Sequence, residues 1–512
     1  MEKTQARGLI RPSHQLPQKR SGLVKLLLAA ICAGAIVARL QTGSWFLFGV
    51  SSTRTTADEG THGVAVDWDT FWDTLPTRPK LEYTPCFDQT PLGGPFQCAR
   101  LELPMDYWNG TTDATFSLAI LRSPAVVPVT DPRYGGVILL NPGGPGGSGV
   151  GFLRRGGDAI RKTVDVKDHK HYDLLSFDPR GVGETTPAVD CIKNPTLDHA
   201  WQLRVMEEGI FEASDAAIGR LWAMSIARSQ SCSLPLPDGE PDIRKYVTTA
   251  SVARDMLEIV ERHGEWRETE ARRLLGCVTN VPSTLLYKPE EEKIQYWGFS
   301  YGTYLGNTFA AMFPDRVGRL IVDGVVDAYD YKKSLWSDNL LDTEKDLQGL
   351  YYHCARAGYP ACALANQTSV TTAKGVEDRV LNITYSLYHN PLPVISPSPE
   401  VITYSDVKNL IFAAQNKAGI STIPLRNQTE GSAAMSIDAT MAIACSDGDD
   451  QSWVNRTTFE KYAKEQARVS PSVGSMWSAI RYVVMDRSLR HSTPTYSALT
   501  RSAPSSLELA GD

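Results

Sequence analysis

The five residues G-F-S-Y-G at positions 298–302 have the types and spacing most able to do chemistry. This G-x-S-x-G run precedes an apolar, helix-like stretch at residues 304–313 and follows a strand-like one. In a nucleophile elbow, the serine sits on a strained strand-to-helix turn, and flanking glycines leave room for the tight backbone. The following helix directs free N–H groups at charge forming near the serine oxygen. The run also arises by chance in Gly-rich loops, so its context decides; the interpretation here is Ser300 as nucleophile, with Gly298 and Gly302 forming the elbow.

A glycine-rich loop lies about 150 residues upstream. The apolar, strand-like residues 136–140 lead directly into N-P-G-G-P-G-G-S-G at residues 141–149. A flexible linker is the alternative, but linkers do not usually start at the end of a buried strand. The loop lacks the G-K-[ST] ending of a phosphate-binding loop. The sequence therefore predicts an oxyanion hole in which an N–H group from Gly143 or Gly144 is joined by that of Tyr301.

A third strand-then-loop unit occupies residues 172–183. Three such units with helical stretches between them indicate a mostly parallel, doubly wound sheet. Asp178 and Arg180 in its loop are candidates for catalysis. The favoured interpretation is structural, with both residues bracing the loop through ion pairs or backbone hydrogen bonds.

The loop N-P-G-G-P-G-G-S-G, the stretch F-D-P-R-G-V-G and the elbow W-G-F-S-Y-G-T occur in this order. Together with C-A-R-L-E-L-P-M-D-Y at 98–107 and R-L-I-V-D-G-V-V at 319–326, they resemble the prolyl and tripeptidyl aminopeptidase branch of the α/β-hydrolases. The resemblance covers roughly residues 80–450. It implies an α/β-hydrolase fold with a helical cap inserted after the sixth strand, Ser300 as the nucleophile, and the N–H groups of Gly144 and Tyr301 as oxyanion donors.

Five regions follow from this resemblance and from the composition along the chain. They are an N-terminal stub and apolar segment (1–50), a linker (51–68), the hydrolase core (69–327), the helical cap (328–444), and a remnant of the C-terminal core with a polar tail (445–512).

The resemblance breaks down where the catalytic acid and base should be. Members of this family carry a late G-x-x-D-P-x-T-P type loop and then a G-H-G type loop, and neither pattern occurs here. The three histidines after Ser300 are His353 and His389, which are expected in the cap, and His491 in the polar tail. His491 is the candidate base because it alone has the right order. Asp323, after a strand-like run, is an alternative acid, with a structural role favoured.

The N-terminal region predicts the compartment. Residues 26–38 form an apolar run preceded by Lys19, Arg20 and Lys25, and apolar character resumes at 45–50. The favoured interpretation is an uncleaved single-pass type II anchor with its positive side cytoplasmic; a cleaved signal peptide of a secreted protein is the alternative. Both place the body of the chain in a lumen or outside the cell.

Cysteines and glycosylation motifs agree with that placement. Three cysteine pairs suit disulfides, and they are Cys86/Cys98, Cys191/Cys232 and Cys354/Cys362. Five N-x-[ST] motifs occur, at Asn109, Asn366, Asn382, Asn427 and Asn455. Disulfides and N-linked glycans are features of oxidising, secretory compartments.

The function expected from these features is that of a serine exopeptidase that releases short N-terminal units from peptides through an acyl-enzyme. An esterase or lactonase acting on small esters is the second hypothesis, and a catalytically dead hydrolase fold used for binding is the third. With 512 residues, 42% hydrophobic content and a net charge of −6, the chain can bury a large core and has no basic stripe for nucleic acid. No cysteine or histidine spacing predicts a metal site, and no cofactor is expected.

Overall fold

The computed structural model describes most of the chain. The described residues are 68–87, 96–237, 240, 242–276, 281–367, 369–415 and 435–483. They divide into two compact units: a smaller one within residues 347–385 and a larger one containing all the others. The apolar N-terminal segment, Asn427 and His491 lie outside these residues, so the expectations attached to them stay predictions.

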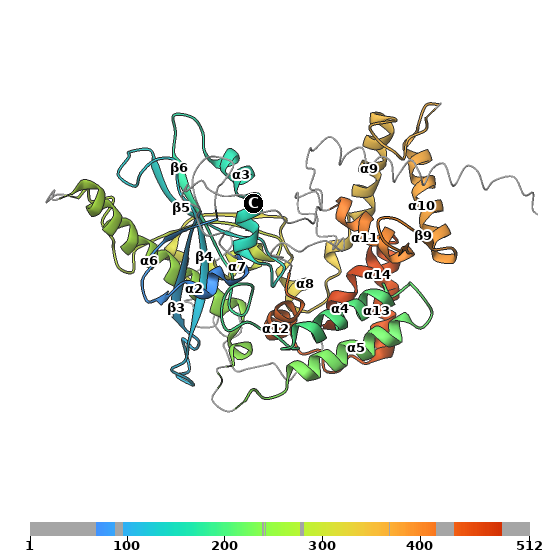
Figure 1. Cartoon of the computed structure of the whole chain (residues 1–512), viewed down its shortest axis with the longest axis horizontal. Coiled ribbons are helices and arrows are strands. Elements are labelled where there is room, and N and C mark those ends of the chain that lie inside the picture. Colours follow the sequence, from blue (N-terminus) through green and yellow to red (C-terminus); the bar gives the residue numbers. More distant parts are fainter. Residues whose placement is uncertain are drawn as a thin grey trace, which may run out of the picture. The chain divides into compact units, whose positions relative to one another are not determined.

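The larger unit is built on an eight-stranded mixed sheet with the order β1-β3-β4-β6-β5-β7-β8, in which β2 pairs with β3 (Figure 1). Strands β6, β5, β7 and β8 run parallel, and β4 joins them antiparallel. The strands are β1 (Thr77–Arg78), β2 (Thr84–Cys86), β3 (Phe96–Pro104), β4 (Thr115–Ser123), β5 (Tyr134–Asn141), β6 (His171–Phe177), β7 (Ile294–Phe299) and β8 (Val317–Asp323). The three strands expected beside the motifs are β5, β6 and β7. The predicted α/β-hydrolase class is therefore confirmed.

Helices cover both faces of this sheet. Because successive side chains of a strand point to opposite faces, Leu139 of β5 belongs to one buried cluster and Leu140 to another. The Leu139 cluster includes apolar residues of α6 (Thr249–Leu275) and α7 (Tyr301–Met312), whereas the Leu140 cluster includes those of α2 (Trp68–Thr74) and α3 (Gly149–Val164). Near-continuous burial on both sides explains why apolar residues stand side by side, without alternation, at residues 118–121 of β4 and 174–175 of β6.

Most remaining helices form insertions. They are α4 (Pro195–Glu208), α5 (Ala217–Cys232), α8 (Ala328–Lys332), α9 (Thr343–Ala357), α10 (Ala373–His389), α11 (Tyr404–Gln415), α12 (Ile437–Asp447), α13 (Arg456–Val469), α14 (Gly474–Trp477) and α15 (Ala479–Val483). Short 3-10 helices occur at Ile243–Tyr246, Pro314–Arg316 and Asp338–Leu340, and a hairpin of β9 (Leu392–Val394) and β10 (Glu400–Ile402) follows α10.

The helical insertions differ from the expected single cap at 328–444. Phe211 and Leu221, which follow β6 in the chain, pack with Phe459 and Ala463 of α13 in one buried cluster. A second insertion, before α6, therefore belongs with the late helices. The boundary expected at 444/445 falls inside α12, a continuous helix whose residues on both sides of that position are buried in the main core.

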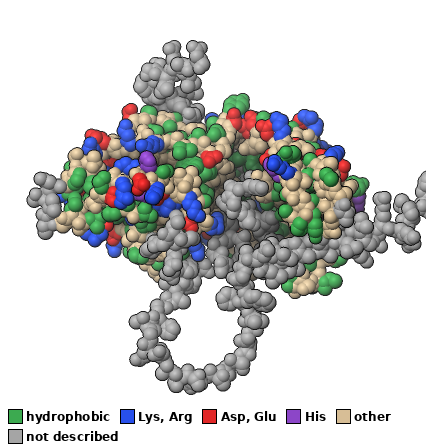
Figure 2. All heavy atoms as spheres, turned by 90° about the horizontal axis from the view of Figure 1, so that it is seen from above, with side chains coloured by type: hydrophobic (Ala, Val, Ile, Leu, Met, Phe, Trp, Pro, Cys, Tyr) green, Lys and Arg blue, Asp and Glu red, His purple; other side chains and the backbone are tan. Residues whose placement is uncertain are grey.

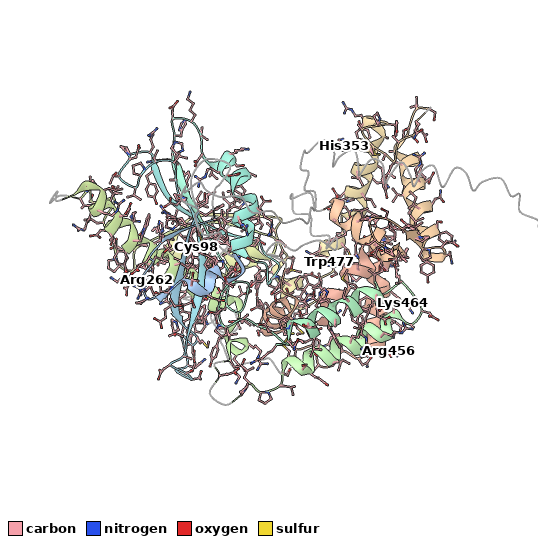
Figure 3. The ribbon with its side chains drawn as sticks, in the orientation of Figure 1. Cys98, Arg262, His353, Arg456, Lys464 and Trp477 are labelled. Atoms are coloured by element: carbon pink, nitrogen blue, oxygen red, sulfur yellow. A yellow bond between two sulfur atoms is a disulfide. The ribbon has the colours of Figure 1, made fainter. Side chains whose placement is uncertain are left out.

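The smaller unit comprises parts of α9 and α10 and the segment that joins them. The Cys354–Cys362 disulfide closes a short loop here. Gln348 of α9 donates a hydrogen bond to Glu377 of α10 at 3.1 Å, and the Arg379 guanidinium donates to the Leu364 carbonyl. His353, which the sequence placed in the cap, lies on α9 in this unit (Figure 3).

The two other disulfides lie in the larger unit and join Cys86 to Cys98 and Cys191 to Cys232. Cys98 lies on β3 (Figure 3). All three bonds join pairs that the sequence suggested. On the face shown in Figure 2, acidic and basic side chains are interspersed. None of the helices described is both long and apolar enough to span a bilayer.

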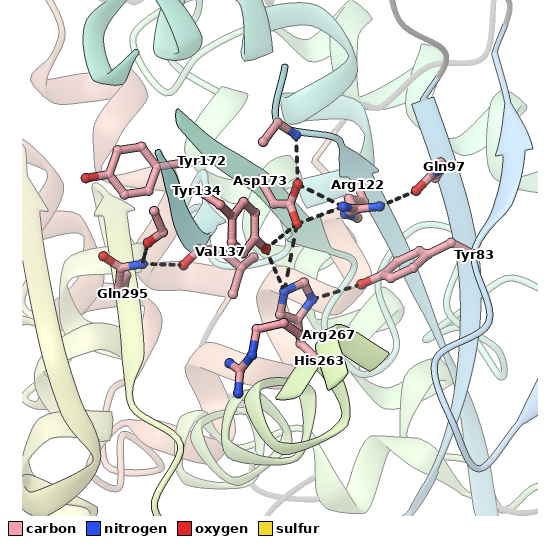
Figure 4. Close-up of polar contacts among 12 residues, drawn as sticks. Tyr83, Gln97, Arg122, Tyr134, Val137, Tyr172, Asp173, His263, Arg267 and Gln295 are labelled. Carbon is pink, nitrogen blue, oxygen red and sulfur yellow. Dashed lines mark hydrogen bonds and ion pairs between the residues drawn. The ribbon is translucent and has the colours of Figure 1, made fainter. Parts of the chain in front are cut away.

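A buried polar network lies where β4, β6 and α6 meet (Figure 4). The Asp173 carboxylate accepts hydrogen bonds from Arg122 at 2.8 and 2.9 Å, from Tyr134 Oη at 2.7 Å and from the Ala125 N–H at 2.7 Å. His263 Nε2 lies 3.8 Å from the same carboxylate. Burial lowers the pKa of His263 to about 3; the Asp173 charge opposes this shift and the Arg122 charge adds to it. The imidazole is therefore neutral at pH 7, although a carboxylate is close by.

Neutral burial of His263 predicts acid sensitivity. The unfolded chain takes up this proton near the ordinary pKa of 6.5, whereas the folded chain takes it up only near 3. The contribution of neutral His263 to the free energy of unfolding is therefore fully present above pH 6.5. It is lost as the pH falls toward 3, by at most about 1.4 kcal/mol per pH unit. In chemical unfolding between pH 4 and pH 7, His263→Phe should flatten the pH dependence, and His199→Gln, at an exposed site on α4, should not. An unchanged slope in His263→Phe would contradict a neutral buried imidazole.

Candidate active site

Ser300 occupies a strained position between β7 and α7. Its φ and ψ are 54° and −125°, outside the regions that L-residues ordinarily adopt. Its N–H donates to the Asp323 carbonyl at 3.0 Å, and its own carbonyl accepts from the Thr303 N–H at 2.8 Å. These two bonds fix the backbone of the turn. Ser300, at the tip of the turn, is exposed. This is the geometry of a nucleophile elbow.

The two glycines of the motif are required by close packing. A Cβ on Gly298 would lie 2.3 Å from the Gly302 carbonyl oxygen, and one on Gly302 would lie 2.7 Å from the Asn141 carbonyl oxygen. No real Cβ tolerates such contacts, so any larger residue would force the strand and helix apart. Tyr296 Oη donates to the Gly302 carbonyl at 2.7 Å and fixes the turn from below.

The glycine-rich loop lies against this elbow. A Cβ on Gly143 would lie 2.8 Å from the Tyr301 nitrogen and 3.0 Å from the Ser300 Cβ, which shows how closely the two segments approach. Gly143 and Gly144 have φ values of 92° and 120°, a region that favours glycine. The sequence prediction that residues 141–149 meet Ser300 therefore agrees with this approach.

One expected oxyanion donor is already engaged. The Gly143 N–H donates to Asn141 Oδ1 at 2.9 Å, a local turn of the kind that Asn side chains form with the backbone two residues on. Gly143 is therefore corrected from a donor to a spacer that allows the close approach. Among the described residues no acceptor is recorded for the Gly144 N–H, and Tyr301, as the first residue of α7, has no intrahelical acceptor. The assignment of these two N–H groups to an oxyanion hole therefore stays a prediction.

Asp178 and Arg180 have structural roles, as the sequence favoured. The buried Asp178 carboxylate accepts from Ser148 Oγ at 2.7 Å and from the Val150 N–H at 2.9 Å, at the end of the glycine-rich loop. Arg180 is fully buried and pairs with Asp255 on α6 at 2.6 Å. Neither residue contacts Ser300 through a recorded hydrogen bond or ion pair.

A buried carboxyl that the sequence analysis missed lies beneath the elbow. Asp447, the last residue of α12, accepts from the Thr249 N–H at 2.8 Å, from Thr249 Oγ1 at 2.6 Å and from Tyr331 Oη at 3.0 Å. Thr249 Oγ1 in turn hydrogen-bonds Tyr301 Oη. Burial raises the pKa of Asp447 to about 6, against the lowering effect of these hydrogen bonds. Thr249 and Asp447 are 198 positions apart, so no local sequence pattern reveals their contact.

The structure does not place a base at Ser300. In the part of the chain that is described, no side chain hydrogen-bonds Ser300 Oγ, and His491 lies outside that part. His389 is the last residue of α10, and no contact between its side chain and the elbow is recorded among the described residues. Asp323 contacts the elbow through its main-chain carbonyl rather than its carboxylate. The general base and its acid partner therefore stay unassigned.

A cavity of about 400 Å³ lies at the N-terminal ends of β5 and β7. It is lined by the first residues of β5, including Tyr134 and Val137, by Gln295 of β7, and by His263 and Arg267 of α6. Figure 4 shows these side chains around the buried network. Since the elbow follows the C-terminal end of β7, this cavity at the strands' starts is not the substrate pocket of Ser300.

Known proteins resemble this chain over part of its length. Serine protease Hip1 of Mycobacterium tuberculosis is 29% identical over 260 residues, which are 49% of this chain and 41% of that protein. Tripeptidyl aminopeptidase of Streptomyces lividans is 29% identical over 278 residues, 53% of this chain and 43% of that protein. Carboxylesterase B of M. tuberculosis is 34% identical over 161 residues, 31% of this chain and 28% of that protein. No protein-family model matches.

The parallel sheet, the strained serine turn and the loop packed against it are features of the α/β-hydrolase fold. Within that class it is similar to the serine protease and aminopeptidase above, and it spans less than half the length of these curated relatives.

Proposed function

We propose that this chain is a serine hydrolase that removes short N-terminal units from peptides through an acyl-enzyme on Ser300. The observation that carries the proposal is the strained Ser300 turn, against which the glycine-rich loop packs closely at Gly143. Strained backbone conformations of this kind cluster at active sites, where they present a side chain for catalysis. The similarity to a tripeptidyl aminopeptidase supports a peptide as the substrate.

The geometry supports the following sequence of events. Ser300 Oγ attacks the scissile carbonyl carbon and loses its proton to a base. The carbonyl oxygen becomes negatively charged and accepts hydrogen bonds from the Gly144 and Tyr301 N–H groups, aided by the positive end of α7. The base then protonates the leaving amine, and water releases the acyl group by the reverse route. His491 is the proposed base because it alone among the three histidines after Ser300 has the order in the sequence that the resemblance implies.

Covalent labelling by a fluorophosphonate probe tests the nucleophile. We expect labelling of the folded wild-type chain at Ser300, complete loss of that labelling in Ser300→Ala, and no change in Ser452→Ala, where the serine is exposed on a loop distant in sequence. His491→Gln should slow labelling strongly if His491 is the base. A folded wild-type chain that takes up no probe would contradict the proposal and favour the binding-protein alternative.

A second candidate function is hydrolysis of small esters, which the similarity to carboxylesterase B favours. The same elbow and hole accept ester carbonyls. Aminocoumarin tripeptides with free and with acetylated N-termini, compared with aryl esters, separate the two. Turnover of the free-amine peptide alone supports the exopeptidase, whereas turnover of the esters alone supports the esterase.

We also propose that the catalytic domain faces a lumen or the outside, held by a type II anchor at residues 26–38. The three disulfides support an oxidising compartment. Asn109, Asn382 and Asn455 are exposed and open to glycosylation, whereas the Asn366 side chain is half-buried against Arg379. Digestion of the cell-derived protein with a peptide-N-glycosidase should lower its apparent mass. An unchanged mass would argue against this placement.

A further inference from the structure

Helix α12 contacts the glycine-rich loop with its first turn and the support of Tyr301 with its last residue. We propose that α12 is a brace that sets the separation of the two oxyanion donors, with Thr440 and Asp447 as its positioning residues. This inference rests on the proposed function. It assigns a role to a segment that lies more than a hundred residues after the elbow and for which no hydrogen bond or ion pair with Ser300 is recorded among the described residues.

The first turn of α12 holds the loop. The Ser436 N–H donates to the Gly146 carbonyl at 3.1 Å, and Thr440 Oγ1 donates to the Pro145 carbonyl at 2.6 Å. A Cβ on Gly146 would lie 2.5 Å from Thr440 Oγ1, so the helix and the loop are in direct contact. Gly144, whose N–H is the proposed donor, directly precedes Pro145 in the chain. A shift of the Thr440 side chain would therefore displace that N–H group.

The last residue of α12 holds Tyr301. The Asp447 carboxylate receives both the N–H and the hydroxyl of Thr249, and Thr249 Oγ1 hydrogen-bonds the Tyr301 hydroxyl. Tyr301 is 4% exposed and packs against the ring of Tyr331, which also hydrogen-bonds Asp447. The side chain of the second donor residue is thus fixed from the far end of the same helix.

The first turn of α12 is also held from the side, and the middle of the helix is buried. Asp438 accepts from the Cys191 N–H at 2.8 Å and pairs with Arg228 of α5 at 2.6 Å. Met441 and Ile443, in the middle of the helix, are buried in the main core. An 11-residue helix spans about 16 Å, so one rigid rod links two groups that must lie within hydrogen-bond reach of the same oxyanion.

Two variants loosen opposite ends of the brace. Thr440→Val keeps the branched shape and removes the hydroxyl that holds Pro145, and Thr249→Val removes the link between Asp447 and Tyr301. Ser446→Ala is the matched control, because Ser446 Oγ donates to the Ala442 carbonyl within α12 and, in the described part of the chain, makes no recorded hydrogen bond to the loop or to Tyr301. A misplaced donor weakens transition-state binding, so we expect kcat per fluorophosphonate-titrated site to fall about 10-fold or more with KM nearly unchanged.

Hydrogen exchange measured by mass spectrometry tests whether α12 holds the loop, independently of catalytic activity. Peptides covering residues 141–149 should exchange faster in Thr440→Val, while those of Ser446→Ala should match the wild type. A purely structural role would lower the melting temperature and the titrated fraction but leave kcat per site unchanged, and that result would overturn the proposal, as would unchanged exchange of the loop. A wild-type chain that cannot be labelled would instead overturn the proposed function, and the exchange data would still decide the brace.

Discussion

Replacing Arg180 by methionine is expected to lower the free energy of unfolding by about 3–5 kcal/mol, the range found when one partner of a buried ion pair is removed. The guanidinium is completely buried. It donates to both oxygens of Asp255, at 2.6 and 2.8 Å, and to the carbonyls of Pro104 and Met105. The rings of Phe116 and Tyr107 lie 4.6 and 4.9 Å from its central carbon.

The large effect arises because the variant leaves the Asp255 carboxylate buried without its counter-charge. The carboxylate would keep one hydrogen bond, from Tyr107 Oη at 2.7 Å. Urea unfolding of Arg180→Met, and of a double variant that also removes the Asp255 charge, measures this loss of stability. The double variant Arg180→Met/Asp255→Asn should be more stable than Arg180→Met alone, because no unpaired charge remains. A double variant that is less stable than the single one would show that the lost packing, rather than the charge, dominates.

An exposed ion pair supplies the matched control. Arg272 and Glu268 pair at 2.6 Å on α6, with the Arg272 side chain 54% exposed. Water screens such a pair, so Arg272→Ala should change the free energy of unfolding by no more than about 1 kcal/mol. Equal losses in Arg272→Ala and Arg180→Met would contradict the dependence on burial.

The sequence identified the sheet and the elbow because their signals are local. Residues 136–140 are an apolar run and residues 172–177 a strand-like one, each leads into a loop that contains glycine, and β5 and β6 form there. The disulfide pairs were found for the same reason, since two of them join cysteines only 12 and 8 positions apart. The favoured structural role of Arg180 was confirmed, but its partner Asp255 could not be named, because the two lie 75 residues apart.

The features that the sequence analysis missed depend on contacts between distant segments. The packing of Phe211 with Phe459 joins residues 248 positions apart in one aromatic contact with ring centroids 5.2 Å apart. The Asp447–Thr249 contact is similarly remote. Periodicity and spacing describe only neighbours along the chain, so they carry no information on these pairs. By contrast, the capture of the Gly143 N–H by Asn141 involves residues two apart, and the tendency of Asn to form such turns was a usable signal.

Gly143→Ala is expected to abolish most of the activity at Ser300 while the remainder of the fold persists. The added Cβ would lie 2.4 Å from the Phe299 carbonyl oxygen and 2.8 Å from the Tyr301 nitrogen, and the residue would have to keep a φ of 92°. Relief of these contacts must push the loop away from the elbow and carry the Gly144 N–H out of reach of the oxyanion. Losing one such donor slows turnover by about 10²–10³, so the fluorophosphonate labelling rate should fall by that order.

Gly156→Ala is the matched control for this loss. Gly156 lies on α3, directly after the same loop, and a Cβ there would meet nothing within 4 Å. Alanine is the better helix former, so this variant should label at the wild-type rate and be up to about 1 kcal/mol more stable. The two variants make the same chemical change 13 positions apart, but only at Gly143 does the new methyl group stand between the loop and the serine, on a backbone with a φ of 92°. If Gly143→Ala is folded and labels as fast as Gly156→Ala, the loop at 141–149 does not supply the oxyanion hole.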